Sequence, residues 1–405
     1  MATGDSRTVE ECFLEDCFTM FRYTIPHPDN FERAKAICQS SKPVTIETPQ
    51  VEDVKDPGEC IYSSDATSRL VMKVTTKKGS ESTEAGPTVL KLHKIHPAKH
   101  RYETKMLYKE LLITMYVQRC EEKIRQEKID RLIATCKPIW YKFSSCEGFE
   151  MDYFAEGTLG QLSRTLRHDN ERLGLLRDAA SGLHFLNSLH IIHFDVKPLN
   201  ICVSMGADGT RVAKWIDLGS AKFTGEKVDR CNLNDTAAYR PPELFPRPGI
   251  QPTEDLVLVD SSADFWRFGL CILEVMTRKS FPPLWSKALM SNDMYKQFIR
   301  MNDRQLMRGL YEPLKFPGLR TSKLPECVDR LLFYLLRLDG AVRMDMEHVT
   351  EELNKHLVLA KVSPLDDAGT SKVSSAIKPA GSIPCQAMLR NSIAGSLELS
   401  HTHCS

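Results

Sequence analysis

The hydrophobic and polar positions of residues 191–217 form two short apolar runs, each with polar residues beside it. The runs at 201–204 and 212–216 predict two strands, and the turn M-G-A-D-G-T between them suits a hairpin because Gly and Asp favour tight reversals. Asp195, Lys197 and Asn200 precede the first strand, and Asp217 follows the second. A hairpin would bring these side chains together. Carboxylate and amide oxygens beside a lysine suit a divalent metal ion and phosphate oxygens.

Three further apolar runs, at residues 60–62, 69–74 and 88–92, predict strands that are separated by polar stretches. Lys91 lies inside the third of these runs. Because burial of an unpaired ammonium is costly, this lysine requires either an exposed face or an anionic partner.

Helical periodicity follows in two places, at about residues 102–118 and at residues 172–189, where the leucines recur on one face. Interleaved opposite charges at residues 119–133 predict a solvated helical face and not a nucleic-acid-binding patch. Residues 149–157 read as an apolar strand that ends at Gly157.

Composition limits the class of protein. The chain has 405 residues, 42% of them hydrophobic and 26% charged, which is ordinary for a globular protein. A formal net charge of +1 gives no electrostatic reason to expect nucleic acid or an anionic membrane as a partner. The 13 cysteines include no C-x-x-C pair, and the N-terminus lacks an apolar signal region. We therefore expect an intracellular protein, in the cytoplasm or nucleus; the oligomeric state is not predicted.

The segment H-F-D-V-K-P-L-N followed by D-L-G resembles the catalytic loop and metal-binding motif of eukaryotic protein kinases, H-R-D-L-x-x-x-N and D-F-G. Further matches are Y-R-P-P-E at 239–243, D-F-W-R-F-G at 264–269, and Arg343 near the end of the large lobe. Together the matches span about residues 55–358.

The resemblance implies an α+β, two-lobed protein-kinase-like fold. A small β-rich N-lobe with one main helix is expected at residues 51–152, and a larger, mainly helical C-lobe at residues 153–358. Residues 1–50 are interpreted as an N-terminal extension. Residues 359–405, rich in Ser, Ala, Gly, Pro and Thr, are expected to be a disordered tail. Its ending H-T-H-C-S offers too few ligands for a structural metal site, so an idle tail is expected.

The resemblance also assigns roles around the phosphates. Asp195 is expected to be the catalytic base, and Lys197 to reach the transferring phosphate. Asn200 and Asp217 are expected to hold Mg²⁺. Lys91, at the position of the V-A-I-K lysine, is expected to bind the α- and β-phosphates of ATP.

The partner expected for Lys91 is Glu110, with Glu103 as the alternative carboxylate and Lys73 as the alternative lysine. The segment joining the lobes is expected to contact adenine. Four residues make up this predicted adenine site: Met151, Asp152, Tyr153 and Phe154.

Structural roles are implied for other matching residues. His193 is expected to pack and form hydrogen bonds inside the lobe, and Asp264 to bind the backbone of the catalytic loop. Thr236 is expected to contact Asp195 and Lys197. Arg343 is expected to pair with Glu243.

The sequence departs from the family pattern at two points. The turn at residues 63–68, which corresponds to the G-x-G-x-x-G loop over the phosphates, contains no glycine. Phe194 replaces the arginine of H-R-D, which in the family often pairs with a phosphate on the activation segment. Control of this protein by such a phosphate is therefore not expected. Leu218, in place of the Phe of D-F-G, keeps an apolar side chain.

The function that follows is a serine/threonine protein kinase that transfers the γ-phosphate of Mg-ATP to a protein substrate. One alternative is a pseudokinase scaffold, which the missing glycines and Phe194 favour. Another is a small-molecule phosphotransferase, which would not account for Lys197, Y-R-P-P-E or Arg343.

Overall fold

A computed structural model describes twelve stretches of the chain, between residues 59 and 362. They are residues 59–64, 69–75, 87–94, 100–124, 132–143, 145–206, 208–233, 235–247, 249–251, 254–278, 302–306 and 324–362. The predicted extension at 1–50, the middle of the glycine-free turn and the H-T-H-C-S ending lie outside the described residues. The last helix reaches Val362, four residues beyond the predicted boundary of the tail at 358.

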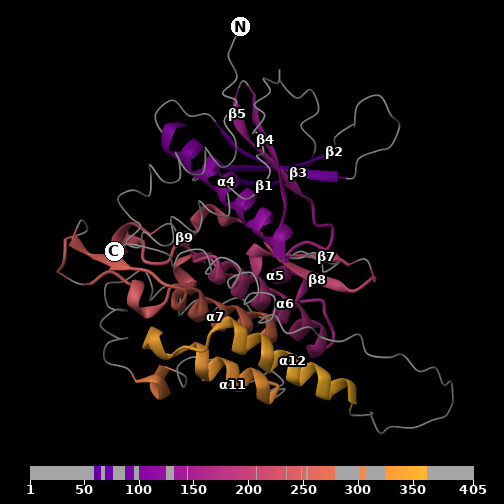
Figure 1. The fold of residues 1–405 in the computed structure, drawn as a ribbon, viewed down its shortest axis with the longest axis vertical. Helices are drawn as coiled ribbons and strands as arrows, with labels where there is room; N and C mark the ends of the chain where they lie inside the picture. The colour runs from indigo at the N-terminus through magenta and orange to yellow at the C-terminus, as the bar shows by residue number, and fades with distance from the viewer. Residues whose placement is uncertain are drawn as a thin grey trace, which may run out of the picture.

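The N-lobe contains a five-stranded sheet in which every neighbouring pair is antiparallel, in the order β1-β2-β3-β5-β4. Its strands are β1 (Glu59–Ser64), β2 (Arg69–Thr75), β3 (Pro87–Lys94), β4 (Cys136–Lys142) and β5 (Cys146–Asp152). The three strands predicted before residue 95 are therefore confirmed. Helix α4 (His100–Ile124) packs against β3, β4 and β5, and Figure 1 shows this lobe at the upper end of the molecule.

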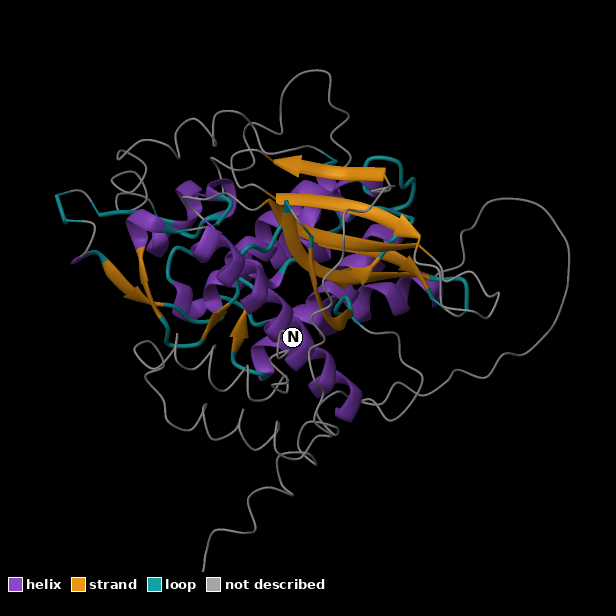
Figure 2. Ribbon diagram, turned by 90° about the horizontal axis from the view of Figure 1, so that it is seen from above, coloured by secondary structure: helices purple, strands orange, loops and turns teal. Residues whose placement is uncertain are grey.

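The C-lobe is mainly helical. Its helices in the described part of the chain are α5 (Leu159–Leu162), α6 (Asp169–Ser188), α7 (Ser262–Thr277), α11 (Glu326–Leu335) and α12 (Met346–Val362). Helix α6 contacts both α7 and α12, and α11 contacts α7 and α12. In the view from above in Figure 2, purple helices lie partly behind the orange strands of the N-lobe sheet. The predicted α+β, two-lobed fold is confirmed.

Short elements connect the helices of the C-lobe. The strands are β6 (Ile191–Ile192), β7 (Ile201–Met205), β8 (Arg211–Trp215), β9 (Lys222–Phe223), β10 (Lys227–Asp229) and β11 (Leu256–Leu258). Within the described residues, six short 3-10 helices accompany them: Pro198–Asn200, Leu218–Ser220, Arg230–Asn232, Ala237–Tyr239, Pro242–Leu244 and Gly340–Val342. The predicted hairpin is β7–β8, with Ile201 opposite Trp215.

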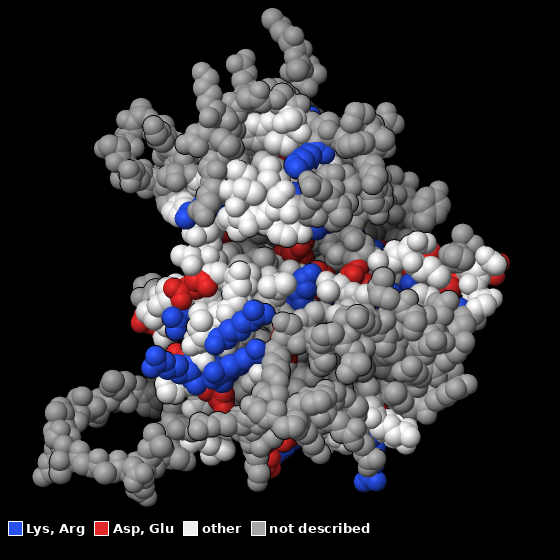
Figure 3. Space-filling model, turned by 180° about the vertical axis from the view of Figure 1, so that it is seen from behind, with Lys and Arg blue, Asp and Glu red and all other residues white. Residues whose placement is uncertain are grey.

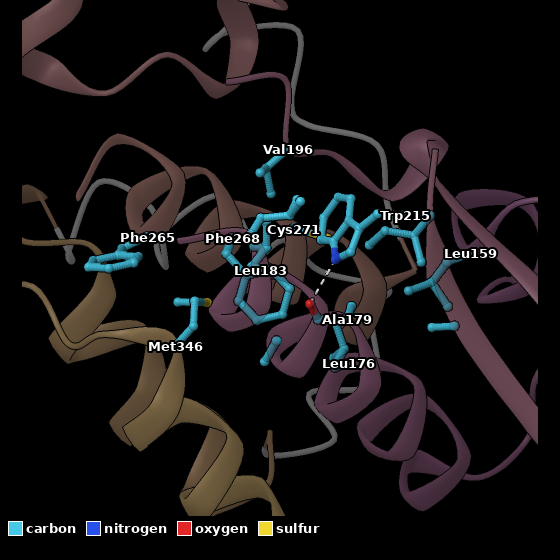
Figure 4. Packing of buried hydrophobic residues seen from close by; sticks show 14 of the residues in the cluster. Leu159, Leu176, Ala179, Leu183, Val196, Trp215, Phe265, Phe268, Cys271 and Met346 are labelled. Carbon is cyan, nitrogen blue, oxygen red and sulfur yellow. Dashed lines mark hydrogen bonds between the residues drawn. The ribbon is translucent and has the colours of Figure 1, made fainter. Parts of the chain in front are cut away.

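The C-lobe core fixes this hairpin on helix α6. The Trp215 indole N–H donates to the carbonyl oxygen of Ala179 at 2.7 Å, as Figure 4 shows among the surrounding apolar side chains. Gly182 leaves room for the indole, because a Cβ there would lie 2.6 Å from Trp215 Cδ1. The polar residues at the two ends of the hairpin are consequently held at fixed positions.

The solvated face predicted for residues 119–133 is wrong at its described ends. Cys120 and Glu121 are buried, and Glu121 Oε1 accepts a hydrogen bond from the Leu132 N–H at 2.9 Å. A carboxylate that binds a backbone amide can be buried despite its charge, and charge periodicity does not reveal this partner. In the described parts of the chain, no helix is both long enough and apolar enough to span a bilayer.

We expect Gly148→Ala to destabilise the N-lobe. A Cβ at Gly148 would lie 2.0 Å from the Lys91 carbonyl oxygen of β3, so the two strands would have to separate. The free energy of unfolding should fall by roughly 1–3 kcal/mol, as for other overpacked sites. Urea unfolding followed by circular dichroism measures this change.

Gly174→Ala in α6 is the matched control. Apart from its two chain neighbours and the backbone of its own helix, no atom lies within 4 Å of a Cβ at Gly174, so the higher helix propensity of alanine should leave stability unchanged or raise it by up to about 1 kcal/mol. Equal losses in both variants would contradict the steric argument.

Candidate active site

Lys91 connects three elements of the structure. From β3, its Nζ lies 2.6 Å from Glu110 Oε1 on α4 and 2.9 Å from Asp217 Oδ1 after β8. The residue is only 6% exposed. Burial by itself lowers the pKa of the ammonium, but the two carboxylates outweigh this effect and hold the pKa above its usual value. Lys91 is therefore a charged lysine.

Glu110 contacts Lys91 of β3, Thr114 of its own helix and the backbone at Gly219. The Thr114 hydroxyl donates to the Glu110 carbonyl oxygen at 2.8 Å, which satisfies a polar side chain inside the lobe. A Cβ at Gly219 would lie 3.0 Å from Glu110 Oε2, so the glycine of D-L-G allows the close approach. Burial raises the pKa of Glu110, and the contact with Lys91 opposes that rise. The alternative carboxylate, Glu103, has a side chain outside the described part.

Asn200 and Asp217 lie together at the open end of the β7–β8 hairpin, Asn200 before its first strand and Asp217 after its second. The N–H of Ile216, next to Asp217, donates to the Asn200 carbonyl oxygen at 3.0 Å. Asp217 adopts a left-handed backbone with φ 63°, which is unusual for a residue other than glycine. Burial favours the neutral form of Asp217, but Lys91 and Arg69 reverse this effect and leave its pKa well below the usual value. The site therefore contains a carboxylate that stays ionised.

The donor set fits a magnesium ion. Asn200 Nδ2 donates to Asp195 at 2.8 Å (carbonyl oxygen) and 2.9 Å (Oδ2), which leaves the amide oxygen of Asn200 as a ligand. An amide oxygen and an ionised carboxylate are the hard oxygen donors that Mg²⁺ prefers. Figure 3 shows acidic and basic side chains along the boundary between the upper and lower parts of the molecule.

Asp195 lies between a lysine and a threonine. Lys197 Nζ is 2.6 Å from Asp195 Oδ2, and both the N–H (3.1 Å) and the hydroxyl (2.6 Å) of Thr236 donate to Oδ1. Lys197 Nζ also lies 2.7 Å from the Thr236 hydroxyl. Burial favours the neutral acid, but Lys197 and Thr236 outweigh it and lower the pKa of Asp195. The predicted Thr236 contacts are confirmed, and Asp195 is an ionised carboxylate.

The catalytic loop is held by Asp264 of α7. Asp264 accepts hydrogen bonds from the backbone N–H groups of His193 at 2.6 Å and Phe194 at 2.9 Å. His193 Nε2 lies 3.0 Å from the Ile216 carbonyl oxygen, and its Nδ1 lies 3.3 Å from the Asp195 N–H. A neutral ring with its proton on Nε2 satisfies both contacts. The structural roles predicted for Asp264 and His193 are confirmed.

The predicted adenine-site residues form the end of β5 and the chain after it. Met151 packs against the main hydrophobic core, and Asp152 Oδ2 accepts from the Thr135 hydroxyl at 2.7 Å. Lys73 Nζ lies 4.6 Å from the centre of the Tyr153 ring, a cation–π contact. Lys91 therefore occupies the position beside Asp217, while the alternative lysine lies against the connecting segment.

Sequence reasoning missed Arg69. Its Nη1 lies 3.9 Å from Asp217 Oδ2, and within the described residues the guanidinium makes no hydrogen bond. Val71 is opposite Lys91 in the sheet, and Arg69, two residues before Val71, shares its face. This period of two was the available signal. Sequence reasoning also missed Asp235, the residue before Thr236, whose carboxylate forms ion pairs with Arg240 and Arg267.

The large lobe contains the predicted ion pair between Glu243 and Arg343. The two guanidinium nitrogens lie 2.6 and 2.7 Å from the two carboxylate oxygens, a bidentate arrangement. The pair connects the Y-R-P-P-E segment to the end of the lobe.

Asp217 of the C-lobe forms ion pairs with Lys91 and Arg69 of the N-lobe. A two-lobed α+β fold with such pairs between its lobes is typical of the kinase-like phosphotransferases. The family model of the protein kinase domain matches residues 88–354, which is more than half of the chain. The chain therefore belongs to the protein kinase family.

Curated relatives agree with this membership. Serine/threonine-protein kinase SBK1 of Danio rerio is 32% identical over 130 residues, which cover 32% of this chain and 31% of the relative. The inhibitor of nuclear factor kappa-B kinase subunit alpha of Danio rerio is 29% identical over 204 residues, 48% of this chain and 26% of the relative. Mitogen-activated protein kinase kinase 9 of Arabidopsis thaliana is 30% identical over 127 residues, 31% of this chain and 38% of the relative. The chain thus spans well under half the length of these relatives.

Lys91→Met should destabilise the protein in a pH-dependent way. The raised pKa of Lys91 means that its charge contributes stability at every pH below about 10.4, its unfolded value. Removal of the charge leaves Glu110 and Asp217 without their shared cation, which should cost roughly 3–5 kcal/mol at pH 7.

The loss should shrink near pH 5, because the raised pKa of Glu110 rises further without Lys91 and the side chain protonates. Urea unfolding at the two pH values measures the difference. Lys355→Met, at an exposed pair with Glu352, is the control. A loss that is the same at both pH values would contradict the coupling.

Proposed function

We propose that this chain is an active serine/threonine protein kinase that transfers the γ-phosphate of Mg-ATP to hydroxyl groups of a protein substrate. The observation that carries the proposal is Asp195. It is an ionised carboxylate fixed by Lys197 and Thr236. Asn200, which donates a hydrogen bond to Asp195, lies at the same end of the β7–β8 hairpin as Asp217. This combination offers a base and a metal site in one place.

The chain's residues would divide the work as follows. Asp195 would accept or orient the proton of the attacking hydroxyl, and its lowered pKa keeps it unprotonated at neutral pH. Lys197 would stand beside the transferring phosphate as a positive charge. Asn200 and Asp217 would hold magnesium. Bound Mg-ATP would supply the phosphoryl group and the metal charge that offsets the negative charge of the transition state.

Nucleotide binding would involve both lobes. Lys91 would bind the α- and β-phosphates while Glu110 keeps it in place. Met151, Asp152, Tyr153 and Phe154 would line the adenine site. Arg69, which directly follows the glycine-free turn in the sequence, would add a second cation on the phosphate side.

Several features support this proposal over its rivals. A pseudokinase scaffold needs neither an ionised Asp195 nor a charged lysine between two carboxylates. A small-molecule phosphotransferase would not account for the Lys197–Thr236 contact or the Glu243–Arg343 pair. The names of the relatives include serine/threonine kinases, which supports that substrate class. We also propose an intracellular location, where the eight described cysteines would be reduced thiols.

Phosphate transfer from labelled Mg-ATP to a mixed protein substrate tests the function. Asp195→Asn should lower kcat by about 10²–10⁴-fold, because a carboxamide keeps the shape of the side chain but is a poor base. The variant should keep the rise in melting temperature that Mg-ATP gives the wild type, since ligands of the native state stabilise it. Asp217→Asn should lose both.

Asp208→Asn, in the exposed turn of the same hairpin, is the matched control and should behave as wild type. Labelled substrate made equally well by Asp195→Asn would exclude Asp195 as the base. A silent wild type that Mg-ATP nevertheless stabilises would favour a nucleotide-binding scaffold.

Arg69→Met should weaken nucleotide binding more than it slows transfer. Loss of one phosphate contact should raise KM for ATP about tenfold, which corresponds to about 1.4 kcal/mol. The melting-temperature rise with Mg-ATP should fall in parallel. Arg211→Met, which removes an exposed arginine paired with Glu156, is the control. An unchanged KM and an unchanged thermal shift would show that Arg69 only neutralises Asp217.

A further inference from the structure

Asp235 is a fully buried carboxylate held by two arginines. Arg267 Nη2 lies 2.7 Å from Asp235 Oδ2, and both side chains have no exposed surface. Arg240 donates from Nε to Oδ1 at 3.1 Å and makes a second contact to the same oxygen through Nη2. We call this group the Asp235 clamp.

Arg267 reaches the clamp from α7, beneath the catalytic loop. Its guanidinium lies 4.4 Å from the centre of the Phe194 ring, a cation–π contact inside the lobe. Its Nε and Nη1 have no hydrogen-bond partner in the described part of the chain. Asp235 is the one carboxylate with which Arg267 forms an ion pair there. Removal of Asp235 would leave a buried guanidinium charge poorly compensated.

The clamp acts on the residue that follows it. Asp235 precedes Thr236, whose N–H and hydroxyl both donate to Asp195 Oδ1. A continuous path therefore runs from α7 through Arg267 and Asp235 to Thr236 and Asp195. The second carboxylate oxygen of Asp195, Oδ2, accepts a hydrogen bond from Lys197 Nζ.

Phe194 shows how this path differs from the family pattern. The kinase pattern has an arginine there, which often pairs with a phosphate on the activation segment. In this chain an arginine from α7 stacks on Phe194 and binds a carboxylate of the segment. A carboxylate held by two guanidinium groups is chemically what a phosphate held by an arginine would otherwise supply.

We infer that Asp235 is a positioning residue: the clamp holds Thr236 on Asp195 without any phosphate on residues 220–243. The significance of the clamp for catalysis rests on the proposed function. The contacts that the clamp maintains can be measured whether or not the protein is active.

Hydrogen exchange on the full chain, treated with phosphatase and checked by mass spectrometry, tests the positioning. The Thr236 amide donates to Asp195, so its exchange reports whether the segment is seated. Asp235→Asn should speed exchange of this amide by about tenfold or more, the effect of about 1.4 kcal/mol of lost protection. Arg240→Met removes only one arm of the clamp and should give a smaller acceleration; it serves where Asp235→Asn does not fold.

Asp255→Asn is the matched control. Asp255 is another fully buried carboxylate held by two arginines, with Arg230 at 2.8 Å and Arg247 at 2.7 Å, but it does not adjoin Thr236. Its loss should lower the melting temperature to a similar extent while leaving Thr236 exchange within about twofold of wild type.

Kinetics separate positioning from stability. With the untreated wild type active, phosphatase treatment should leave kcat within about twofold. Asp235→Asn should lower kcat about 30-fold or more with KM for ATP nearly unchanged, because the Lys91 and Asp217 side of the site is intact. The kcat of Asp255→Asn should fall much less than that of Asp235→Asn.

Three results would overturn the inference. They are Thr236 exchange that Asp235→Asn leaves unchanged, Thr236 protection that disappears from the wild type on phosphatase treatment, and activity losses in the two Asn variants that simply follow their melting temperatures. A wild type that is silent before treatment, with the exchange results as expected, would instead refute the proposed function and leave the clamp established.

Discussion

The structure depends on a single buried ammonium. Lys91 belongs to the sheet of one lobe, Glu110 to the helix behind it, and Asp217 to the hairpin of the other lobe, 126 residues further along the chain. A lysine that is 6% exposed is stable as a cation only with nearby negative charge. One charge thus links β3, α4 and the hairpin. Gly219, where a Cβ would lie 3.0 Å from Glu110 Oε2, makes that arrangement sterically possible.

The same constraint recurs through the large lobe. Asp195, Asp235 and Asp255 are each shielded from water and each contact at least one cation. Replacement of such pairs by apolar residues often leaves stability unchanged or increases it, so their number is weak evidence for stability. Their value here is directional. An ion pair with hydrogen bonds fixes the orientation of a carboxylate, and Lys197 and Thr236 fix that of Asp195 in this way.

Local pattern was sufficient to predict the frame of this site. Apolar runs and the M-G-A-D-G-T turn predicted the β7–β8 hairpin, and family motifs predicted the Lys91–Glu110 and Glu243–Arg343 contacts. Prediction failed where the deciding partner is set by three-dimensional packing. Glu121 was assigned to a solvated face because its amide partner, Leu132, lies beyond the end of its helix. Asp235 was missed because Arg267, its partner, comes from a helix that begins more than 20 residues later.

Backbone strain occurs next to the candidate catalytic residues. Phe194 and Asp217 both adopt left-handed conformations, with φ 65° and 63°, which cost of order 1–3 kcal/mol for such residues. Asp264 holds the first through the Phe194 N–H, and Lys91 holds the side chain of the second. Phe194 directly precedes Asp195, and Asp217 directly follows Ile216, whose N–H donates to the Asn200 carbonyl oxygen. Positive φ values also occur at His190 and Arg278, so a left-handed backbone alone does not mark a site. At Phe194 and Asp217 it coincides with hydrogen bonds to Asp264 and Lys91, and this combination fixes the backbone on both sides of Asn200 in the chain.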